Sequence, residues 1–599
     1  MKKTKLFALA FAALALGACS NDDIVDQQGG GAQWNAEGEG YVSLSIQLPS
    51  QSGSRSNAND QYEDGTPDEY DVKDGTLILF ADGKINSAYD LKGIHFSNEE
   101  PVNNNITTTA KITQKINDFK TVEGLVVLNK NGLFTVNDET GDLQVAGASM
   151  VGKTLDEFNK AVNNTVTAGD SWHNNGFLMS NAVLATAPGG ATQPTAATAS
   201  TLVTIDDSKI FTTAEEASRK PAANFYVERA ESKVTLIANV TGKTTEGTEF
   251  DYTINGWMLD NTNNSSKVVR TVNGFETWKT LASNATGVTD LYRFVGSKVV
   301  GKDITGEKTY YRTYWGEDYN YADAPANSFT TIGGKTISTG ETTGSNVNND
   351  VLVTDLSGET PRYCFENTSD LANMLEKNMT RAVIKTTFND GKDFFLLESD
   401  MNKMWQEADV KQEAAARLIK EPSFNAWAKQ NLLDKNTTLT EADFNVTLTT
   451  AAGACTISDI TLTEDGQNKF KPNVTLPSNV ETTANDEITI TRYVGGASYY
   501  SVWINHFGKE GTPWNGGETD APGIGTDVSS IYHNSDANYL GRWGMLRNNW
   551  YEVNVEAIRG IGDPTVAEVT GETIDKKVPY ISVTINILSW AKRVQNVTL

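Results

Sequence analysis

Apolar and polar residues alternate strictly from Val42 to Leu48, within the segment that begins at Gly40. The apolar positions are Val42, Leu44, Ile46 and Leu48, and the residues between them are Ser43, Ser45 and Gln47. A period of two places all the apolar side chains on one face of an extended chain. The pattern therefore predicts a half-buried strand, with the small polar side chains on its other face.

A polar loop follows this strand. Pro49 closes the pattern, and residues 50–60 are mostly Ser, Asn, Gln and Gly around a single Arg55. Loops of this composition are accessible to proteases. A cut between Arg55 and Ser56 would leave the strand held by hydrogen bonds and side-chain burial alone, so that it could be withdrawn. Periodicity alone favours the simpler interpretation, an ordinary first strand followed by a loop.

Further strand patterns occur along most of the chain. Two continuous apolar runs, Leu77–Phe80 and Leu125–Leu128, predict buried central strands. The turn sequence at 389–391 predicts a hairpin that joins residues 383–384 to residues 394–396. We therefore expect strands to dominate the fold.

Helical spacing is clear in two places only. Leu155, Phe158 and Val162 follow it, and a longer helical pattern runs across residues 401–433 with a break predicted at Pro422. These segments predict a few short helices in a β protein.

Composition changes suggest where the chain divides. Residues 186–201 are nearly all Ala, Thr, Gly and Pro, and the polar stretch that follows predicts a domain boundary at 215–224. A strand over residues 225–240 would open the second domain, and the Gly-, Thr- and Asn-rich tract at 326–350 would be a long loop on it. A chain of 599 residues should form two or three domains.

The C-terminal end has a second alternating segment. Its apolar positions are Ile581, Val583, Ile585 and Ile587. Residues 591–599 then run to the terminus with no turn or helix signal, and their apolar residues are Val594, Val597 and Leu599. A free terminal segment that can form a strand promotes aggregation unless it pairs with another strand. It is either a strand donated to another molecule or a frayed last strand.

The N-terminal end predicts export. Lys2, Lys3 and Lys5 precede an uncharged run over residues 6–16, and Cys19 follows Leu-Gly-Ala. A basic start and a short apolar run are typical of a secretory signal peptide, and the cysteine predicts a lipoprotein signal. The alternative is an ordinary signal peptide with a cysteine near its end by chance. Once cleaved, the chain would carry a lipid on Cys19 and continue as a flexible tether.

The net charge of the chain narrows the possible partners. The chain has 50 Lys and Arg against 76 Asp and Glu, a net charge of −26, and no basic patch is visible in the sequence. Phosphate binding needs such patches, so nucleic acid is disfavoured as a partner.

Cys364 and Cys455 could pair in an oxidising compartment, but the sequence cannot place them within bonding distance.

One motif has the spacing of a phosphate-binding loop. Residues Gly147–Thr154 match it formally. Such a loop needs a parallel α/β sheet and a carboxylate for magnesium, whereas its neighbours predict a β domain. We therefore reject a nucleotide site.

Other chemistry is weakly supported. The histidines, His95, His173, His506 and His533, lack metal-ligand spacing. The Asn- and Asp-rich run at 346–350 lacks a calcium-loop pattern, and the tryptophans near the C-terminus are more consistent with core packing than with a sugar-binding platform. We expect no catalytic residues, no metal, no cofactor and no enzyme activity.

Several strings of residues, taken in order, resemble a known family. They are Asp68–Phe80, Gly176–Ala182, Val227–Val234, Gly256–Thr262, Tyr363–Thr368, Leu546–Val553 and Ile587–Trp590. Together with Cys19, the Arg55 loop and the free terminal strand, they resemble the Bacteroidia-type fimbrillin family of type V pili. Within that family, the pattern is similar to the major structural subunit of the minor fimbrium.

The resemblance implies a fold and a division of the chain. The fold would be mainly β, with two β-sandwich-like (transthyretin-like) domains, a few short helices and long loops. A signal peptide over 1–18 would precede a tether and removable strand over 19–55. An N-terminal β domain with an acceptor groove would span 56–222, a C-terminal β domain with insertions 223–590, and a donor strand 591–599.

The resemblance also implies a mechanism of assembly. The precursor would reach the outer membrane as a lipoprotein, an Arg-specific protease would cut after Arg55, and the strand Tyr41–Leu48 would leave its groove. The C-terminal strand of the next copy would fill that groove, building an extracellular fimbrium that supports adhesion. Partners would be further copies of the chain, accessory anchor and tip subunits, the protease, and host or bacterial surface ligands. A surface glycan-binding lipoprotein and an accessory tip or anchor protein remain alternatives, and both would tend to keep the lipidated N-terminus.

Overall fold

The structure is a computed structural model of the 599-residue chain. It describes residues 31–48, 62–63, 69, 71–94, 105–116, 119–162, 164–165, 176–185, 199–263, 265–271, 295–303, 306–313, 316–318, 329–330, 352–369, 373–451, 453–504, 543–572, 574 and 581–590.

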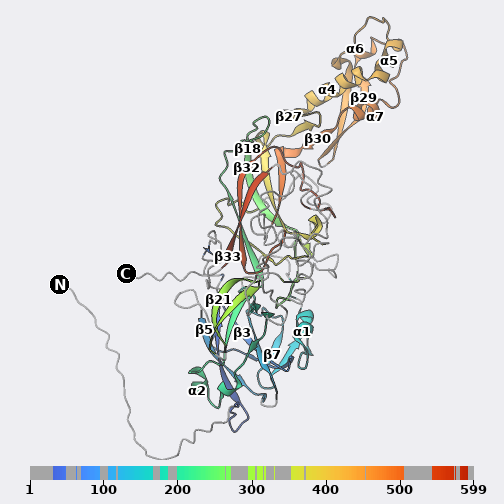
Figure 1. Ribbon diagram of the computed structural model, residues 1–599. Coiled ribbons are helices and arrows are strands. Elements are labelled where there is room, and N and C mark those ends of the chain that lie inside the picture. The colour runs from blue at the N-terminus through green and yellow to red at the C-terminus, as the bar shows by residue number, and fades with distance from the viewer. Residues whose placement is uncertain are drawn as a thin grey trace, which may run out of the picture.

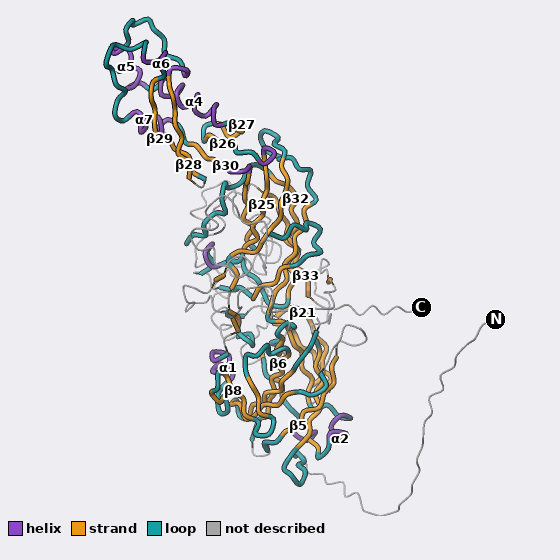
Figure 2. Tube along the Cα trace, turned by 180° about the vertical axis from the view of Figure 1, so that it is seen from behind, coloured by secondary structure: helices purple, strands orange, loops and turns teal. Residues whose placement is uncertain are grey.

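The described parts lie along one elongated molecule (Figure 1). An N-terminal β domain occupies one end, a C-terminal β domain the middle, and a smaller module of helices and strands the other end. The view from behind shows the same order (Figure 2). Each part has its own hydrophobic core. The mainly β fold predicted from the sequence is confirmed, with β-sandwich domains and few helices.

The N-terminal domain is built on a sheet of nine strands. They are β1 (Gly40–Gln47), β3 (Gly75–Ala81), β4 (Lys84–Asp90), β5 (Asn105–Ile112), β6 (Val122–Leu128), β11 (Met179–Asn181), β14 (Val203–Thr204), β15 (Ile210–Phe211) and β16 (Ala223–Arg229). The predicted central strands are confirmed, because β3 lies between β4 and β6 and is buried along its whole length. A short helix, α2 (Ala214–Ser218), packs against β1 and β5.

A second layer covers the outer face of β3 and β6. It consists of β7 (Thr135–Asn137), β8 (Asp142–Val145), β9 (Ala148–Ser149) and helix α1 (Leu155–Ala161). Thr154 caps α1 by accepting a hydrogen bond from the Glu157 backbone nitrogen at 3.2 Å. The helix predicted at 155–162 is therefore confirmed, and its Phe158 is fully buried against the sheet.

The C-terminal domain packs two sheets around one core. The first contains β2 (Tyr62–Glu63), β17 (Glu231–Ala238), β24 (Arg362–Phe365), β32 (Asn549–Ile558) and β33 (Ile581–Trp590), and the second β18 (Tyr252–Asp260), β25 (Arg381–Phe388) and β31 (Ala497–Trp503). The strand predicted near the C-terminal end is confirmed as β33. The single strand predicted over 225–240 is two strands, because β16 stays in the N-terminal sheet and the chain changes sheets at Ala230.

The distal module has one sheet with helices on it. Its strands are β26 (Phe394–Leu397), β27 (Asp400–Trp405), β28 (Phe444–Ala451), β29 (Ala454–Leu462) and β30 (Ile490–Tyr493), and its helices are α4 (Glu407–Lys420), α5 (Pro422–Asn431), α6 (Glu464–Gln467) and α7 (Val480–Glu487). The helical pattern across 401–433 is only partly right. Residues 401–405 belong to β27, and Pro422 begins α5 instead of merely ending α4, since a first-turn proline lacks only a nitrogen that has no helical partner.

The predicted hairpin at residues 389–391 is wrong. The turn exists, with Asp390 in the left-handed region at φ 53°, but β25 and β26 belong to different sheets. The turn therefore leads the chain out of the C-terminal domain and into the distal module. Turn chemistry is local, so it cannot specify which sheet the next strand will join.

The remaining elements complete the described fold. They are β10 (Asn164–Thr165), β12 (Leu184–Ala185), β13 (Ala199–Ser200), β19 (Thr262–Asn263), β20 (Ser265–Ser266), β21 (Val295–Asp303), β22 (Gly306–Thr313), β23 (Phe329–Thr330), and the 3-10 turns η3 (Asp207–Lys209), η5 (Glu376–Asn378), η6 (Asn389–Gly391), η7 (Glu441–Asp443) and η8 (Val494–Gly496). Most of the long loop predicted at 326–350 lies outside the described residues. Within the described ranges, the chain has no helix long and apolar enough to cross a membrane.

Candidate functional site: the slot that holds the first strand

Strand β1 is paired along both of its edges. On one side it runs antiparallel to β5 over its whole length, from the pair Gly40–Ile112 to the pair Gln47–Asn105. On the other side it runs antiparallel to β15 at Tyr41 and Val42, and then parallel to β16 from Leu44 to Gln47. The first strand in sequence is therefore an interior strand of the sheet, and we call the place that it fills the slot.

The apolar face of β1 lies in the core of the N-terminal domain, as its alternation predicts. Val42, Leu44 and Ile46 have no exposed surface, and Leu48 is 2% exposed. They belong to the same core as Ile112 of β5 and Phe225 of β16. Withdrawal of β1 would thus open a groove with apolar walls and two unpaired strand edges.

The polar face of β1 is also buried, which the sequence did not predict. Ser43 is fully buried and Ser45 is 5% exposed. Helix α2 packs against β1 and β5, and its Ala217 is fully buried. Ser43 Oγ donates a hydrogen bond to the Thr108 carbonyl oxygen at 3.2 Å, which satisfies the hydroxyl without water. The prediction of a half-buried strand is therefore wrong at Ser43 and Ser45, because the tertiary fold buries this face as well.

The residues before β1 are attached to the same domain. Gln33 donates its backbone N–H to the Ile210 carbonyl at 3.0 Å, and the Asn35 side chain accepts from the Glu39 backbone nitrogen at 2.8 Å. Lys111 of β5 binds the Glu39 carboxylate, and this contact lowers the pKa of Glu39. The segment upstream of the strand therefore adds to its attachment.

The residues after the predicted cut are attached elsewhere. Strand β2 runs parallel to the end of β33, with Tyr62 opposite Ser589 and Glu63 opposite Trp590. Residues 49–61 thus connect a strand of the N-terminal sheet to a strand of the C-terminal sheet. A cut among them would separate β1 from β2 without breaking either pairing.

Glu69 fixes this downstream segment at the junction between the two domains. Its carboxylate is 1% exposed, lies 2.8 Å from Lys233 Nζ and accepts a hydrogen bond from the Tyr363 hydroxyl at 2.6 Å. Arg229 Nε donates to the Glu69 carbonyl oxygen at 3.0 Å. Burial raises the pKa of Glu69, but Lys233 and the Tyr363 hydroxyl outweigh it, so that the pKa lies below its ordinary value.

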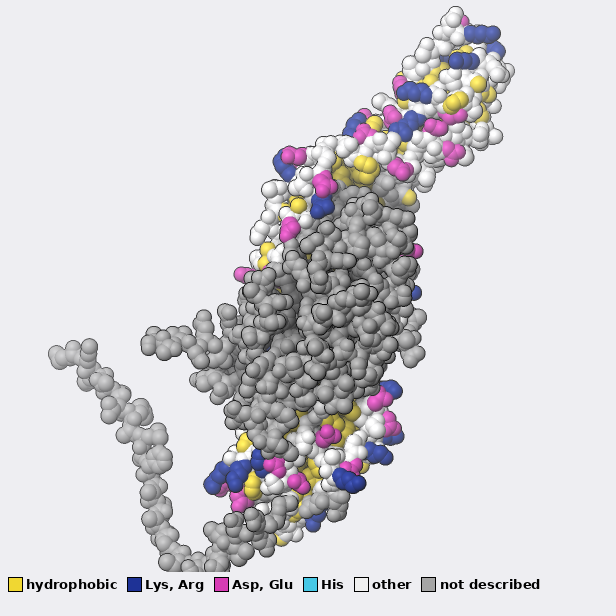
Figure 3. Space-filling model, in the orientation of Figure 1, with side chains coloured by type: hydrophobic (Ala, Val, Ile, Leu, Met, Phe, Trp, Pro, Cys, Tyr) yellow, Lys and Arg dark blue, Asp and Glu magenta, His cyan; other side chains and the backbone are white. Residues whose placement is uncertain are grey.

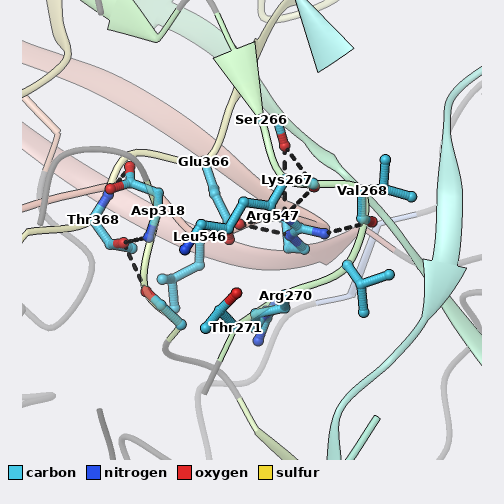
Figure 4. A network of polar contacts seen from close by, with 12 residues as sticks. Ser266, Lys267, Val268, Arg270, Thr271, Asp318, Glu366, Thr368, Leu546 and Arg547 are labelled. Atoms are coloured by element: carbon cyan, nitrogen blue, oxygen red, sulfur yellow. Dashed lines mark hydrogen bonds and ion pairs between the residues drawn. The ribbon is translucent and has the colours of Figure 1, made fainter. Parts of the chain in front are cut away.

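A second network of buried charges lies close to the same junction (Figure 4). Arg547 donates to Glu366 at 2.9 Å and to the Lys267 carbonyl at 2.9 Å, and Arg270 pairs with Glu228 at 3.1 Å. Burial raises the pKa of the nearby Glu231 to about 8, although Arg547 opposes this shift. Such networks hold two packed domains in one arrangement only if their members stay paired.

Several predicted site residues lie outside the described part of the chain. They are Cys19, Arg55, Ser56, Val594, Val597 and Leu599. Of two other arginines that a protease could reach by sequence, Arg381 is buried at 2% exposure, whereas the side chain of Arg219 at the end of α2 is 70% exposed. Burial therefore protects Arg381 from a protease in the folded protein. Arg219 is exposed, so it can serve as the comparison for Arg55 in a cleavage experiment.

The structure supports no catalytic assignment for the motifs that it describes. The Gly147–Thr154 segment forms the turn from β8 through β9 to α1, and the sheet there is antiparallel. Within the described ranges, no group of three or more His, Cys, Asp or Glu residues could hold a metal ion. All four histidines and residues 346–350 lie outside those ranges. Cys364 and Cys455 are both buried and free.

The visible surface carries charges of both signs. Figure 3 shows Lys and Arg side chains interspersed with Asp and Glu on the N-terminal domain and on the distal module. The described part of this face has no broad basic patch of the kind that nucleic acid would need.

Sequence reasoning missed the residues that hold the slot and the junction together. Glu69 and Lys233 are far apart in sequence, and no periodicity relates them. Only the buried position of a charged residue could have indicated such a pair, and burial depends on the tertiary fold.

Comparisons with known proteins agree with the resemblance in the sequence. A family model described as "major fimbrial subunit protein type IV, fimbrillin, C-terminal" matches residues 529–596, which include β32 and β33. No curated protein matches the chain.

Solved structures with similarity to the chain include three fimbrial proteins. A fimbrilin from Porphyromonas gingivalis is 11% identical, with a TM-score of 0.36, over 92% of this chain and 99% of its own. A fimbrial assembly protein from Parabacteroides distasonis is 12% identical, with a TM-score of 0.21, over 58% and 99%. A tip fimbrial protein from Porphyromonas gingivalis is 16% identical, with a TM-score of 0.20, over 55% and 92%. The match over residues 529–596 supports a Bacteroidia-type fimbrillin family for this chain.

Proposed function

We propose that the protein is a structural shaft subunit of a cell-surface fimbrium that polymerises by exchange of the strand in the slot. The observation that carries this proposal is β1 itself, the first strand in sequence, which lies in the interior of the sheet with partners on both edges. Cleavage after Arg55 would allow β1 to leave together with residues 31–39. The C-terminal strand of the next subunit, for which residues 591–599 are the first candidate, would then enter the slot.

The free energy of burying apolar side chains favours a slot refilled by another strand over a slot left empty. Burial of the four apolar side chains contributes roughly 1.5–3 kcal/mol each, or roughly 6–12 kcal/mol in total before ordering costs. An empty slot would expose this surface together with the unpaired edges of β5 and β16. Refilling it with a strand from a second copy restores both, and slow release would make the polymer persistent.

The proposal extends to export and partners. Cys19 would carry the lipid of an outer-membrane precursor, an Arg-specific protease would make the cut, and anchor and tip subunits would begin and end the fibre. The fibre would be extracellular and would support adhesion through host or bacterial surface ligands. A fimbrillin family points to a structural role for the chain instead of a catalytic one.

The N-terminus of the protein in sheared surface fibres tests this function. We expect terminal peptides that begin at Ser56 in a high-mass assembly. Arg55→Ala should abolish the cut and the assembly, whereas Arg219→Ala, at an exposed arginine outside the loop, should change neither. A monomer that keeps a lipidated Cys19 would overturn the proposal and favour a surface-anchored binding protein or an accessory subunit.

A further inference from the structure

Strand β28 (Phe444–Ala451) forms one edge of the sheet in the distal module, beside β29 (Figure 2). Among the residues that the structure describes, it pairs with β29 and with no other strand. The Thr447 carbonyl oxygen accepts a hydrogen bond from Ser458 Oγ of β29 at 3.3 Å, so it faces that strand. Backbone groups alternate between the two edges of a strand, and those of Val446 and Leu448 therefore point to the free edge.

This edge lacks the features that usually prevent pairing with another molecule. Sheet edges are commonly protected by charged side chains, by proline, by a bulge or by shortness. The eight residues of β28 read Phe-Asn-Val-Thr-Leu-Thr-Thr-Ala and include neither a charge nor a proline. The bulge in its pairing with β29 falls on β29, where Ser458 is the extra residue. By contrast, β27 at the opposite edge of the sheet carries an exposed lysine, Lys403.

The two faces of β28 differ in polarity. Val446 is buried in the core of the module, and Leu448 packs against that core. Asn445, Thr447 and Thr449 are exposed on the other face. A strand that joins this edge therefore needs apolar residues on the core side and polar residues on the outer side.

A second copy of β28 meets this requirement when it runs antiparallel to the first. In a twofold arrangement centred on Thr447, Val446 of each copy lies opposite Leu448 of the other, and Asn445 lies opposite Thr449. The pair of Val446 and Leu448 then exchanges backbone hydrogen bonds, because both residues direct their groups to the free edge. Apolar side chains meet on one face and short polar ones on the other, and the strand has no charged residue that would meet its own copy.

We propose that the β28 edge is an interface at which two copies of the chain pair antiparallel, so that two distal modules share one continuous sheet. Such an interface is self-complementary, as a twofold contact must be. One pair of edge strands is short and binds weakly on its own. In a fibre of the kind proposed above the edge recurs in every subunit, so weak pairs would add between two fibres that lie side by side. The pairing itself does not depend on strand exchange.

Sedimentation velocity of the purified chain at increasing concentrations tests this inference. The measurements would use the Arg55→Ala chain, in which β1 stays covalently joined to the strands that follow it and strand exchange cannot contribute. We expect reversible dimers. Asn445→Lys with Thr449→Lys should raise the dimer dissociation constant roughly ten-fold or more, because each lysine then faces a lysine of the other copy. Asn445→Lys with Thr449→Glu should not raise it, because opposite charges then meet.

The two charge variants differ only in the sign of the charge at position 449, so each is the control for the other. Both substituted positions, Asn445 and Thr449, are exposed, so neither change removes a core contact. A general charge effect would act in the opposite direction, because two added lysines reduce the net charge of −26 and hence the repulsion between copies.

Cross-linking tests the register. In the proposed pairing, the two Thr447 residues form a pair without mutual hydrogen bonds, with Cα atoms about 4.5 Å apart. Thr447→Cys should therefore give a disulfide-linked dimer on a non-reducing gel after mild oxidation, whereas Thr456→Cys, exposed on β29, should not. The natural Cys364 and Cys455 are buried. Monomers at every concentration, equal dissociation constants of the two charge variants, or the absence of the Thr447 cross-link would each overturn the inference and leave the proposed strand exchange untouched.

Discussion

The charged residues that matter most to stability in this protein are those that the fold removes from water. Lys233 is 3% exposed, contacts Glu69 and lies 3.8 Å from the centre of the Trp550 ring. Exposed pairs such as Lys243 with Glu249 are screened by solvent and contribute little. At the scale of single residues, burial therefore separates important charges from unimportant ones.

Removal of the Glu69 carboxylate should destabilise the domain junction. Glu69→Ala leaves Lys233 buried without its ion pair, which costs about 3–5 kcal/mol in comparable sites. We expect a clear fall in the free energy of unfolding, measured by denaturant titration. The matched control is Glu249→Ala, which removes a 69% exposed partner of Lys243 and should leave the titration almost unchanged. Similar behaviour of the two variants would contradict the assignment of Glu69 as an anchor.

Glu231 should give the stability a measurable pH dependence. Its pKa is raised to about 8 in the folded protein and is near 4.3 in an unfolded chain, so the folded state binds the proton more tightly. The stabilisation is therefore complete below about pH 4.3 and is lost as the pH rises towards 8. Glu231→Gln should remove this loss, so that the variant gains melting temperature relative to the natural chain between about pH 5 and pH 8. Parallel pH profiles would show that Glu231 does not titrate as inferred.

At the scale of elements, β1 combines strong attachment with the means of its removal. It is paired on both edges and has buried residues on both faces, yet a cut within residues 49–61 would end its covalent connection to the strands that follow it. The alternation in its sequence is sufficient to make it a strand. Because β1 lies between β5 and β16, its removal would leave a gap in the sheet.

Shortening an inward side chain of β1 should weaken the attachment of this strand to the N-terminal domain. Leu44→Ala deletes buried methyl groups from the N-terminal core and should cost about 2–5 kcal/mol of stability. In the chain cut after Arg55, the N-terminal fragment should dissociate faster, as measured by size exclusion with time. Gln47→Ala, at a partly buried position on the other face, serves as the control and should have a small effect. Equal release rates for both variants would indicate that inward burial does not hold the strand.

At the scale of the whole molecule, the distal module is an insertion joined through neighbouring strands. Leu397 of β26 lies opposite Ile490 of β30, so the chain leaves and returns at one place. Phe394 and Tyr493 stack at 4.6 Å within the core of the C-terminal domain, whereas Phe395 and Leu397 belong to the core of the module. Strands β26 and β30 thus serve two cores, one on each face.

Excision of the module should leave the two β domains folded. Residues 398–489 can be replaced by Asn-Gly, a sequence suited to a two-residue hairpin turn. Phe395, Leu397 and Ile490 would be changed to Thr because they lose their apolar cover. We expect the unfolding transition of the module to disappear and that of the remaining domains to persist in calorimetry. The same three substitutions in the full chain should destabilise the module alone, and general unfolding of the shortened chain would contradict its independence.

Prediction from sequence succeeded where the signal was periodic and local. The strands at 42–48, 77–80, 125–128 and 581–587 and the helix at 155–161 all follow patterns that a few neighbouring side chains define. It failed at residues 389–391, where the turn forms but joins strands of two different sheets, and at residues 225–240, where the single predicted strand is two strands in two sheets. For the candidate site, the inward residues of β1 were predictable and the burial of its polar face was not.

The sequence by itself determined which segments form strands, which face of β1 is apolar and how acidic the chain is, because these properties depend on residue type and spacing along the chain. The tertiary structure alone decided that Ser43 and Ser45 are buried, that Glu69 meets Lys233, and that β1 lies between β5 and β16. Each of these contacts joins residues distant in sequence. Their free energy comes from the burial and pairing that result when the folded chain brings those residues together.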